Sequence, residues 1–205
     1  MLHKPCKEGA GCVASVYRRI KNYISLSTYG HKRSAYNAQF IGACSDHNWN
    51  QIWKTKVEPK CRFFVWLLLQ RKLPTADTIN KRGGQADPIC KLCYSRSESH
   101  VHLAENCTYS KRVWQQVEIW SGEQGLKQNQ HTSRVKDWWT HLNTAQGHTT
   151  AAAQKRAQIV VYKAWNLWKE RCRRVFDNKA TDVQLLLASI QDDIQSLHMA
   201  RDELE

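Results

Sequence analysis

The most apolar stretch of the chain lies between residues 61 and 73 and reads CRFFVWLLLQRKL. A helix needs about 20 apolar residues to span a membrane, so this segment is too short to cross a bilayer. A helix that is apolar on all sides is typical of a protein interior. The pattern therefore predicts a central buried helix at residues 61–73.

Two further helical patterns precede this segment. Their apolar positions stand three or four residues apart, at Tyr36, Phe40 and Ile41 and then at Trp49, Ile52 and Trp53. We expect the second pattern to end at Pro59. Residues 1–33 show no sustained period, which predicts a loose basic N-terminal segment.

Two helices are predicted after the central one. Pro74 interrupts the chain, Thr75 can cap a short helix with the sequence ADTINKRG, and the pair Gly83-Gly84 ends it. The second helix carries an apolar stripe that should pack on residues 61–73. Its positions i, i+4 and i+7 are Val113, Val117 and Trp120.

The C-terminal half predicts three more helices. A polar stretch at residues 121–133 precedes a short helix whose apolar side chains are Val135, Trp138, Trp139 and Leu142. A long helix is predicted from Ala151 to Phe176, and basic residues surround its apolar stripe. The stripe consists of Ala157, Val161, Trp165, Trp168, Cys172 and Val175. The last helix, from Thr181 to Arg201, should form an antiparallel hairpin with the long one.

The net charge of +13 is concentrated ahead of residue 83. Residues 1–82 hold 15 Lys and Arg against 4 Asp and Glu, while the rest of the chain is nearly balanced. A basic segment of this kind attracts polyanions, of which nucleic acid is the usual one. Lysine and arginine also keep surfaces soluble, so charge favours nucleic-acid binding without establishing it.

Composition and the start of the chain predict an intracellular protein. The chain has 41% hydrophobic and 24% charged residues, values of an ordinary globular protein. Its first residues, MLHKPCKEGAGCV, lack the apolar core of a secretory signal, and we expect no membrane span. In a reducing compartment, nuclear or cytoplasmic, the eight cysteines would not form a disulfide framework.

The stretch from Asp87 to Trp114 is here called the Cys/His segment. Four of its residues have the spacing of a metal site. Cys90, Cys93, His102 and Cys107 read C-x2-C-x8-H-x4-C. Three thiols and one imidazole are the ligand set of a closed structural zinc site. Each residue alone would more often be a buried cysteine or an ordinary histidine, but four within eighteen positions favour zinc.

The identity of the histidine ligand stays open from the spacing alone. His100 gives C-x6-H-x6-C, and on a strand its side chain would point the same way as that of His102.

Several motifs in this region resemble a known family. Residues 52–114 contain W-K-x-K, F-F-x-W-L, T-A-D, R-G, C-x-x-C, H-x4-C and V-W in that order. This series is similar to the zinc-binding domain at the C-terminal end of reverse transcriptases of plant non-LTR retrotransposons. SAYNAQF, ahead of it, and WNLWKERCRRVFD, after it, resemble flanking stretches of the same proteins. The resemblance favours His102 as the ligand and implies retroelement RNA or DNA as the original partner.

The chain departs from the family pattern at three positions without losing a ligand. Glu58 replaces a usual proline, Asn106 a frequent histidine, and Cys172 a usual asparagine. The palm and endonuclease segments of such polymerases are not seen ahead of the match. We therefore expect the tail region of a retroelement protein without its polymerase part.

The resulting fold prediction is mainly α: a small helical domain around a Cys3His zinc knuckle, followed by a C-terminal helical hairpin. Its divisions are residues 1–33, a loose segment; 34–120, the zinc-binding domain; 121–150, a linker with a short Trp-rich helix; and 151–205, the hairpin. The sequence does not define the oligomeric state.

Two functions remain in view. In the first, the protein is a non-catalytic module that binds RNA or single-stranded DNA, with aromatic side chains such as Trp53 stacking on unpaired bases. The basic candidates are Lys54, Lys56, Lys60, Arg62, Arg71, Lys72, Lys81 and Arg82. In the second, it is a relic or protein-interaction domain whose zinc is only structural.

An enzymatic role receives little support from these residues. Four protein ligands leave zinc no open position for water. A zinc deaminase needs glutamate two residues after its histidine ligand, whereas Leu103 and Ala104 follow His102.

Overall fold

The computed structural model describes residues 47–126, 133–143 and 150–202. Within these ranges every regular element is a helix, and Ile89 and Ser97 form an isolated antiparallel bridge. The helices are α3 His47–Lys54, α4 Pro59–Leu69, α5 Ala76–Lys81, η1 His102–Asn106, α6 Thr108–Ser121, α7 Val135–Asn143, α8 Thr150–Cys172, η2 Arg173–Asp177 and α9 Val183–Asp202. The mainly α prediction is confirmed, whereas the predicted N-terminal segment and the pattern at Tyr36 lie outside the described residues.

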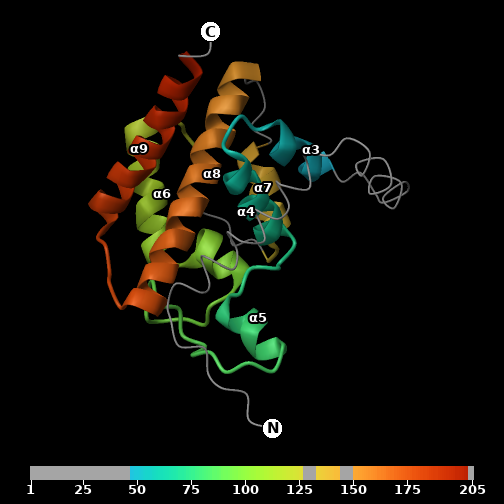
Figure 1. Ribbon diagram of the computed structural model, residues 1–205, viewed down its shortest axis with the longest axis vertical. Coiled ribbons are helices and arrows are strands. Elements are labelled where there is room, and N and C mark those ends of the chain that lie inside the picture. Colours follow the sequence, from blue (N-terminus) through green and yellow to red (C-terminus); the bar gives the residue numbers. More distant parts are fainter. Residues whose placement is uncertain (1–46, 127–132, 144–149, 203–205) are drawn as a thin grey trace.

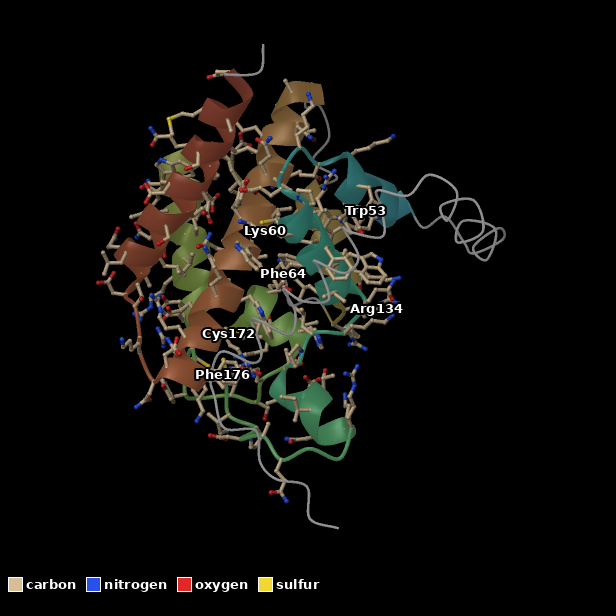
Figure 2. The ribbon with its side chains drawn as sticks, viewed as in Figure 1. Trp53, Lys60, Phe64, Arg134, Cys172 and Phe176 are labelled. Carbon is tan, nitrogen blue, oxygen red and sulfur yellow. The ribbon has the colours of Figure 1, made fainter. Side chains whose placement is uncertain are left out.

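The central helix is α8 and not the apolar segment at residues 61–73. Figure 1 shows α8 in orange, running between α9 and α6 on one side and α4 and α7 on the other. Every residue from Arg156 to Trp168 is buried. Helix α4 buries one face against α8, where Phe64 packs on Trp165 and Trp168 at ring distances of 5.2 and 6.2 Å (Figure 2).

Helix α4 also differs from its prediction at both ends. Pro59 stands at its first turn and ends no helix there, because proline is well suited to the position where the backbone N–H has no helical partner. The helix ends at Leu69, four residues earlier than expected, and Arg71 follows with φ 55°. Phe63 and Trp66 remain half-buried on the outer side.

Polar side chains of α8 are buried because each has a partner. Gln158 donates to the carbonyl of Lys56 at 2.9 Å, and Arg156 donates to the carbonyl of Leu142 at 2.6 Å. Asn166 donates to Asp193 at 2.8 Å. Hydrogen bonding offsets the cost of removing such groups from water, so a helix with many polar residues can occupy the core.

Helix α6 packs on α9 and α8. The sequence predicts instead that this helix packs on residues 61–73. Val113 and Val117 are buried in this contact. Trp120, the third residue of the expected stripe, is 40% exposed at the end of the helix. The stripe is therefore buried over about one helical turn, from Val113 to Val117, and then leaves the core.

Helices α8 and α9 run antiparallel, as predicted, and are joined by a short connection (Figure 1). Leu186, Leu187, Ile190 and Ile194 are buried along α9. Residues from Ile52 to Ile194 belong to one hydrophobic cluster, which includes Cys90 and Cys107. The division of the chain into segments remains a prediction, but the described parts share this core.

None of the described helices has both the length and the apolar character required to cross a membrane.

A buried ion pair joins the Cys/His segment to the C-terminal end of α8. Arg171 Nη2 and Nε lie 2.8 and 3.2 Å from the two carboxylate oxygens of Glu98. The Arg171 guanidinium also lies 5.1 Å from the Trp168 ring. Glu98 accepts a third hydrogen bond, 2.7 Å long, from the backbone N–H of Ala76 at the start of α5. This bidentate pair therefore connects three separate parts of the chain.

A second arginine extends the same connection. Arg174 donates to the carbonyls of Lys91 and Leu92 at 3.3 and 3.1 Å and lies 4.5 Å from the Tyr109 ring. The buried carboxylate of Glu170 accepts hydrogen bonds from Arg173 and Arg174. The Cys/His segment therefore docks on the end of α8 and on η2, which follows it.

Removal of one partner of the Glu98–Arg171 pair should destabilise the protein, because it leaves the other charge buried without a partner. We expect Glu98→Gln to lower the free energy of unfolding, measured in urea, by about 3–5 kcal/mol. Lys81→Met removes the exposed pair with Asp77 and should change that free energy by less than about 1 kcal/mol. Equal losses in the two variants would contradict a special role for the buried pair.

Candidate metal centre

The turn that carries Cys90 and Cys93 is closed by its own backbone. The N–H of Cys90 donates to the carbonyl of Arg96 at 2.8 Å, and the N–H of Tyr94 donates to the carbonyl of Cys90 at 2.8 Å. Tyr94 adopts φ 52°, which turns the chain back after the second cysteine. The backbone N–H of Leu92 points at Cys90 Sγ, 3.4 Å away, and can stabilise a thiolate there.

His102 and Cys107 stand at the two ends of the π-helix η1. The N–H of Cys107 donates to the carbonyl of His102 at 2.8 Å, a bond between residues five apart. In an ordinary α-helix such residues would lie about 140° apart around the axis. The wider π turn brings them back to one side, so the H-x4-C spacing directs both side chains to one point.

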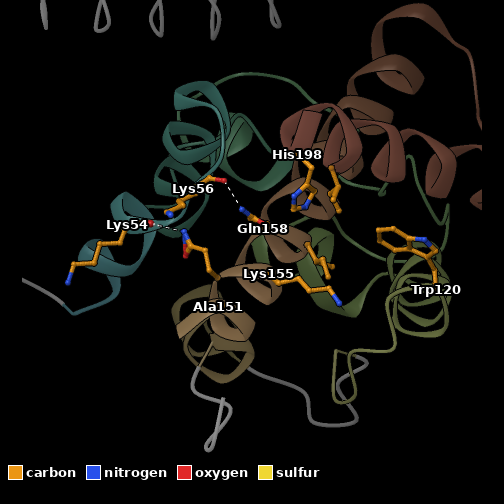
Figure 3. Close-up of a pocket in the computed structure, with 10 residues that line it drawn as sticks. Lys54, Lys56, Trp120, Ala151, Lys155, Gln158 and His198 are labelled. Atoms are coloured by element: carbon orange, nitrogen blue, oxygen red, sulfur yellow. Dashed lines mark hydrogen bonds between the residues drawn. The ribbon is translucent and has the colours of Figure 1, made fainter. Parts of the chain in front are cut away.

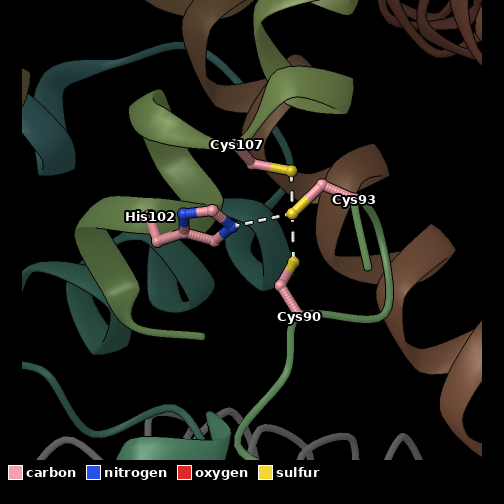
Figure 4. A group of neighbouring side chains, drawn as sticks. All are labelled: Cys90, Cys93, His102 and Cys107. Carbon is pink, nitrogen blue, oxygen red and sulfur yellow. Dashed lines mark hydrogen bonds between the residues drawn. The ribbon is translucent and has the colours of Figure 1, made fainter. Parts of the chain in front are cut away.

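The four side chains of the predicted site converge (Figure 4). Their ligand atoms all lie within 4.8 Å of one another, with Cys90 Sγ to Cys107 Sγ at 4.0 Å and Cys93 Sγ to His102 Nε2 at 3.4 Å. Tetrahedral bonds of about 2.3 Å to sulfur and 2.0–2.1 Å to nitrogen place ligand atoms roughly 3.5–3.8 Å apart. The arrangement therefore fits a single tetrahedral ion, and in the described parts of the chain it is the one such group of three or more His, Cys, Asp or Glu.

The hydrogen bond between Cys90 and Cys107 shifts their two pKa values in opposite directions: it raises the pKa of Cys90, with burial as a second cause, and lowers the pKa of Cys107. A hydrogen bond with Cys90 lowers the pKa of Cys107 to about 3, with a further contribution from His102, although burial opposes it. Burial, the largest single effect, disfavours the charged form of His102, but the hydrogen bonds and charges of Cys107 and Cys93 together outweigh it and raise the pKa of His102. Because the thiolate is the form that binds metals, Cys107 is prepared for coordination by its surroundings.

His100 lies outside this cluster. Residues 100 and 101 are helical, so His100 and His102 point in different directions and do not share a face as they would on a strand. His100 is buried with its Nδ1 3.4 Å from Thr75 Oγ1, beside α5. Burial lowers the pKa of His100. Only His102 of the two is placed to contact the same ion as the cysteines.

Sequence reasoning missed three residues that support the site: Lys163 and Arg171 of α8, which are buried, and Arg174 of η2. Besides Arg171 and Arg174, the fully buried Lys163 donates to the carbonyl of Ala104 at 3.3 Å, inside η1. Its ammonium lies 3.7 Å from the Trp114 ring. Complete burial lowers the pKa of Lys163, while the charges of Cys107 and Glu105 oppose that shift. The WKERCRR stretch was a signal for such contacts, but its arginines were expected to surround an apolar stripe.

The eight predicted basic residues do not form one cluster. They lie in α3, α4 and α5 and in the segments that come after each of these helices, and most of them are exposed. The two that are half-buried are Lys60 and Arg62. Lys54 and Lys56 line a groove with α8 and α9, whereas Lys81 pairs with Asp77 at 3.6 Å.

Comparison with known proteins identifies the region around the cluster. Residues 31–114 match the family described as zinc-binding in reverse transcriptase, which confirms the resemblance inferred from the motifs. A protein of Arabidopsis thaliana that carries the name of a ribonuclease H protein is 23% identical over 149 residues, which cover 70% of this chain. The match spans 23% of that relative's length. No solved structure matches the chain.

The geometry predicts different effects for the two histidines. We expect His102→Ala to lose most of its bound metal, because one of four ligands is removed, and His100→Ala to retain it. Elemental analysis of the purified proteins after dialysis measures metal per chain. Retention in His102→Ala together with loss in His100→Ala would transfer the ligand role to His100.

Proposed function

We propose that the protein is a non-catalytic zinc-binding module that binds RNA or single-stranded DNA inside the cell. Cys90, Cys93, His102 and Cys107 would hold the zinc ion. Three thiolates and an imidazole in tetrahedral reach of one another suit zinc better than cations that prefer oxygen ligands. The matching family, named for zinc binding, supports the same metal.

The zinc would act on structure and not on a substrate. Four protein ligands complete a tetrahedral shell and leave no position for a reactive water. Cys90, His102 and Cys107 are buried, and the ion would close the loop between the bridge at Ile89 and the start of α6. Zinc would therefore fix a segment whose named elements ahead of α6 are the short η1 and an isolated bridge.

A group of aromatic and basic side chains on and beside the outer side of α4 carries the nucleic-acid proposal. This group, here called the basic–aromatic face, consists of Trp53, Arg62, Phe63, Trp66 and Lys72. The rings of Phe63 and Trp66 stack with centroids 5.4 Å apart. Lys72 Nζ lies 5.2 Å from the Trp66 ring, and Arg62 Nη1 donates to the carbonyl of Trp53 at 3.1 Å. Trp53 is 40% exposed.

This combination of groups suits a single strand. Unpaired bases stack on aromatic rings, while nearby cations contact phosphates, and neither contact requires a particular sequence. The remaining basic candidates lie ahead of α4, within it or after it along the chain: Lys54, Lys56, Lys60, Arg71, Lys81 and Arg82. The names of the family and of the ribonuclease H relative refer to proteins that act on polynucleotides, which agrees with this partner.

Zinc binding by the cluster has a direct test in Cys93→Ser. We expect the wild type to hold one zinc per chain and the variant to lose it, with increased amide exchange across the Cys/His segment. Structural zinc in small sites contributes on the order of 10 kcal/mol to the folded form, so the loss should be large. Cys61→Ala, which removes a buried thiol outside the cluster, should keep its zinc. Equal zinc content in Cys93→Ser and the wild type would refute the assignment.

Binding of single-stranded RNA should depend steeply on salt. Each phosphate contact to a single strand contributes about −0.7 to the slope of log K against log salt concentration. We expect the double variant Arg62→Gln, Lys72→Gln to bind more weakly and with a slope shallower by roughly 1.4. Lys179→Gln, an exposed change between η2 and α9, is the matched control and should bind like the wild type. No binding by the wild type at low salt would favour an interaction domain with structural zinc.

A further inference from the structure

A groove of about 760 Å³ opens where four helices meet away from the metal cluster. Its walls come from the connection between α3 and α4, the end of α6, the first half of α8 and the second half of α9 (Figure 3). Small-molecule sites in proteins commonly have volumes of about 300–1,000 Å³. The groove is therefore large enough for a compact organic ligand.

The side chains around the groove combine apolar and basic character. Trp120, Ile159 and Ile194 supply apolar surface, and Lys56, Lys155 and His198 supply nitrogen groups. Among the residues that the structure describes, none of those that line it is acidic. Lys155 pairs with Glu123 at 3.6 Å, but its side chain is 56% exposed, so this pair is weak and the ammonium can turn to another anion.

Trp120 has an orientation that its helix alone does not require. The buried stripe of α6 ends at Val117, and Trp120 is 40% exposed beyond it. Figure 3 shows its indole turned toward the space between Lys155 and His198. An exposed aromatic ring bordered by cations is a stacking platform for a planar, negatively charged ligand.

The wall formed by the connection between α3 and α4 is held in place by α8. Gln154 donates to the carbonyl of Lys54, and Gln158 donates to the carbonyl of Lys56, both at 2.9 Å (Figure 3). These bonds fix the backbone from which Lys56 extends. The Lys54 side chain extends away from the groove toward the outside. A preformed wall reduces the ordering cost of binding.

We propose that this groove holds one nucleotide of a bound single strand, with the base on Trp120 and the phosphate between Lys56 and Lys155. This proposal rests on the proposed nucleic-acid function and assigns it a second contact region, separate from the basic–aromatic face. In the sequence, Lys54 stands between Trp53 of the basic–aromatic face and Lys56 of the groove. A purely apolar ligand would leave the lysines unused, and a free inorganic anion would leave the apolar surface exposed.

The test measures, by fluorescence anisotropy at low salt, how tightly a short single-stranded RNA binds to the variants Trp120→Leu, Trp120→Phe and Lys155→Gln. We expect Trp120→Leu to weaken binding roughly tenfold, as loss of one stacked base does, and Trp120→Phe to retain most of the affinity. Lys155→Gln should weaken binding and reduce the salt slope by about 0.7. Ile119→Ala, an exposed change next to Trp120, should leave affinity unchanged.

The outcomes separate this proposal from the broader one. If Trp120→Leu and Lys155→Gln bind RNA like the wild type while Arg62→Gln, Lys72→Gln is weakened, the groove proposal fails and the nucleic-acid function stands. If the wild type binds no RNA, both fail. If a glutamate-rich peptide binds the wild type but not Trp120→Leu, and RNA binding is the same in both, the groove is a peptide site and the nucleotide assignment is overturned.

Discussion

The bidentate ion pair between Arg171 and Glu98 is the contact through which the two halves of this structure depend on each other. It joins the end of the central helix α8 to the middle of the Cys/His segment, with both side chains at most 5% exposed. Two charges removed from water need this geometry and further polar contacts. Here the backbone N–H of Ala76 donates a hydrogen bond to Glu98, and the Trp168 ring makes a cation–π contact with Arg171. The pair therefore specifies how the segment sits on the helices, in addition to any stability that it contributes.

Helix α8 connects all the regions to which a role is assigned. Its first half forms one wall of the groove, its middle packs on α4 beneath the basic–aromatic face, and its last turns hold the Cys/His segment. Lys163, in its middle, reaches the carbonyl of Ala104 inside η1. A metal ion at the cluster would thus be linked through one rigid helix to both proposed contact regions for nucleic acid.

Some of this organisation could be predicted from the sequence, because the relevant signals are local. The C-x2-C pair and the following histidine and cysteine identify a cluster by spacing alone, and the apolar periods locate α7, α8 and α9 within a few residues. The position of α8 at the centre was missed, because Arg156, Lys163 and Arg171 look like a solvated face until their buried partners are known. Those partners lie far away in the sequence, and no local pattern contains them.

The choice between His100 and His102 shows the same limit at a single site. Spacing permits either residue, and on a strand the two side chains would point in the same direction. The segment is instead helical, and its winding separates the two rings. Trp120 is a related case, since the helical period assigned it to the core although α6 extends beyond the surface that it packs on.

The winding of η1 has a consequence for how this type of site can vary in length. In the π-helix η1, residues five apart lie on the same side, whereas in an α-helix residues four apart do. A chain with three residues between the histidine and the cysteine, wound as a regular α-helix, would place them about 40° apart and could bind the same ion. Insertion or deletion of one residue at this position is therefore a change of helix type and need not be a loss of the site.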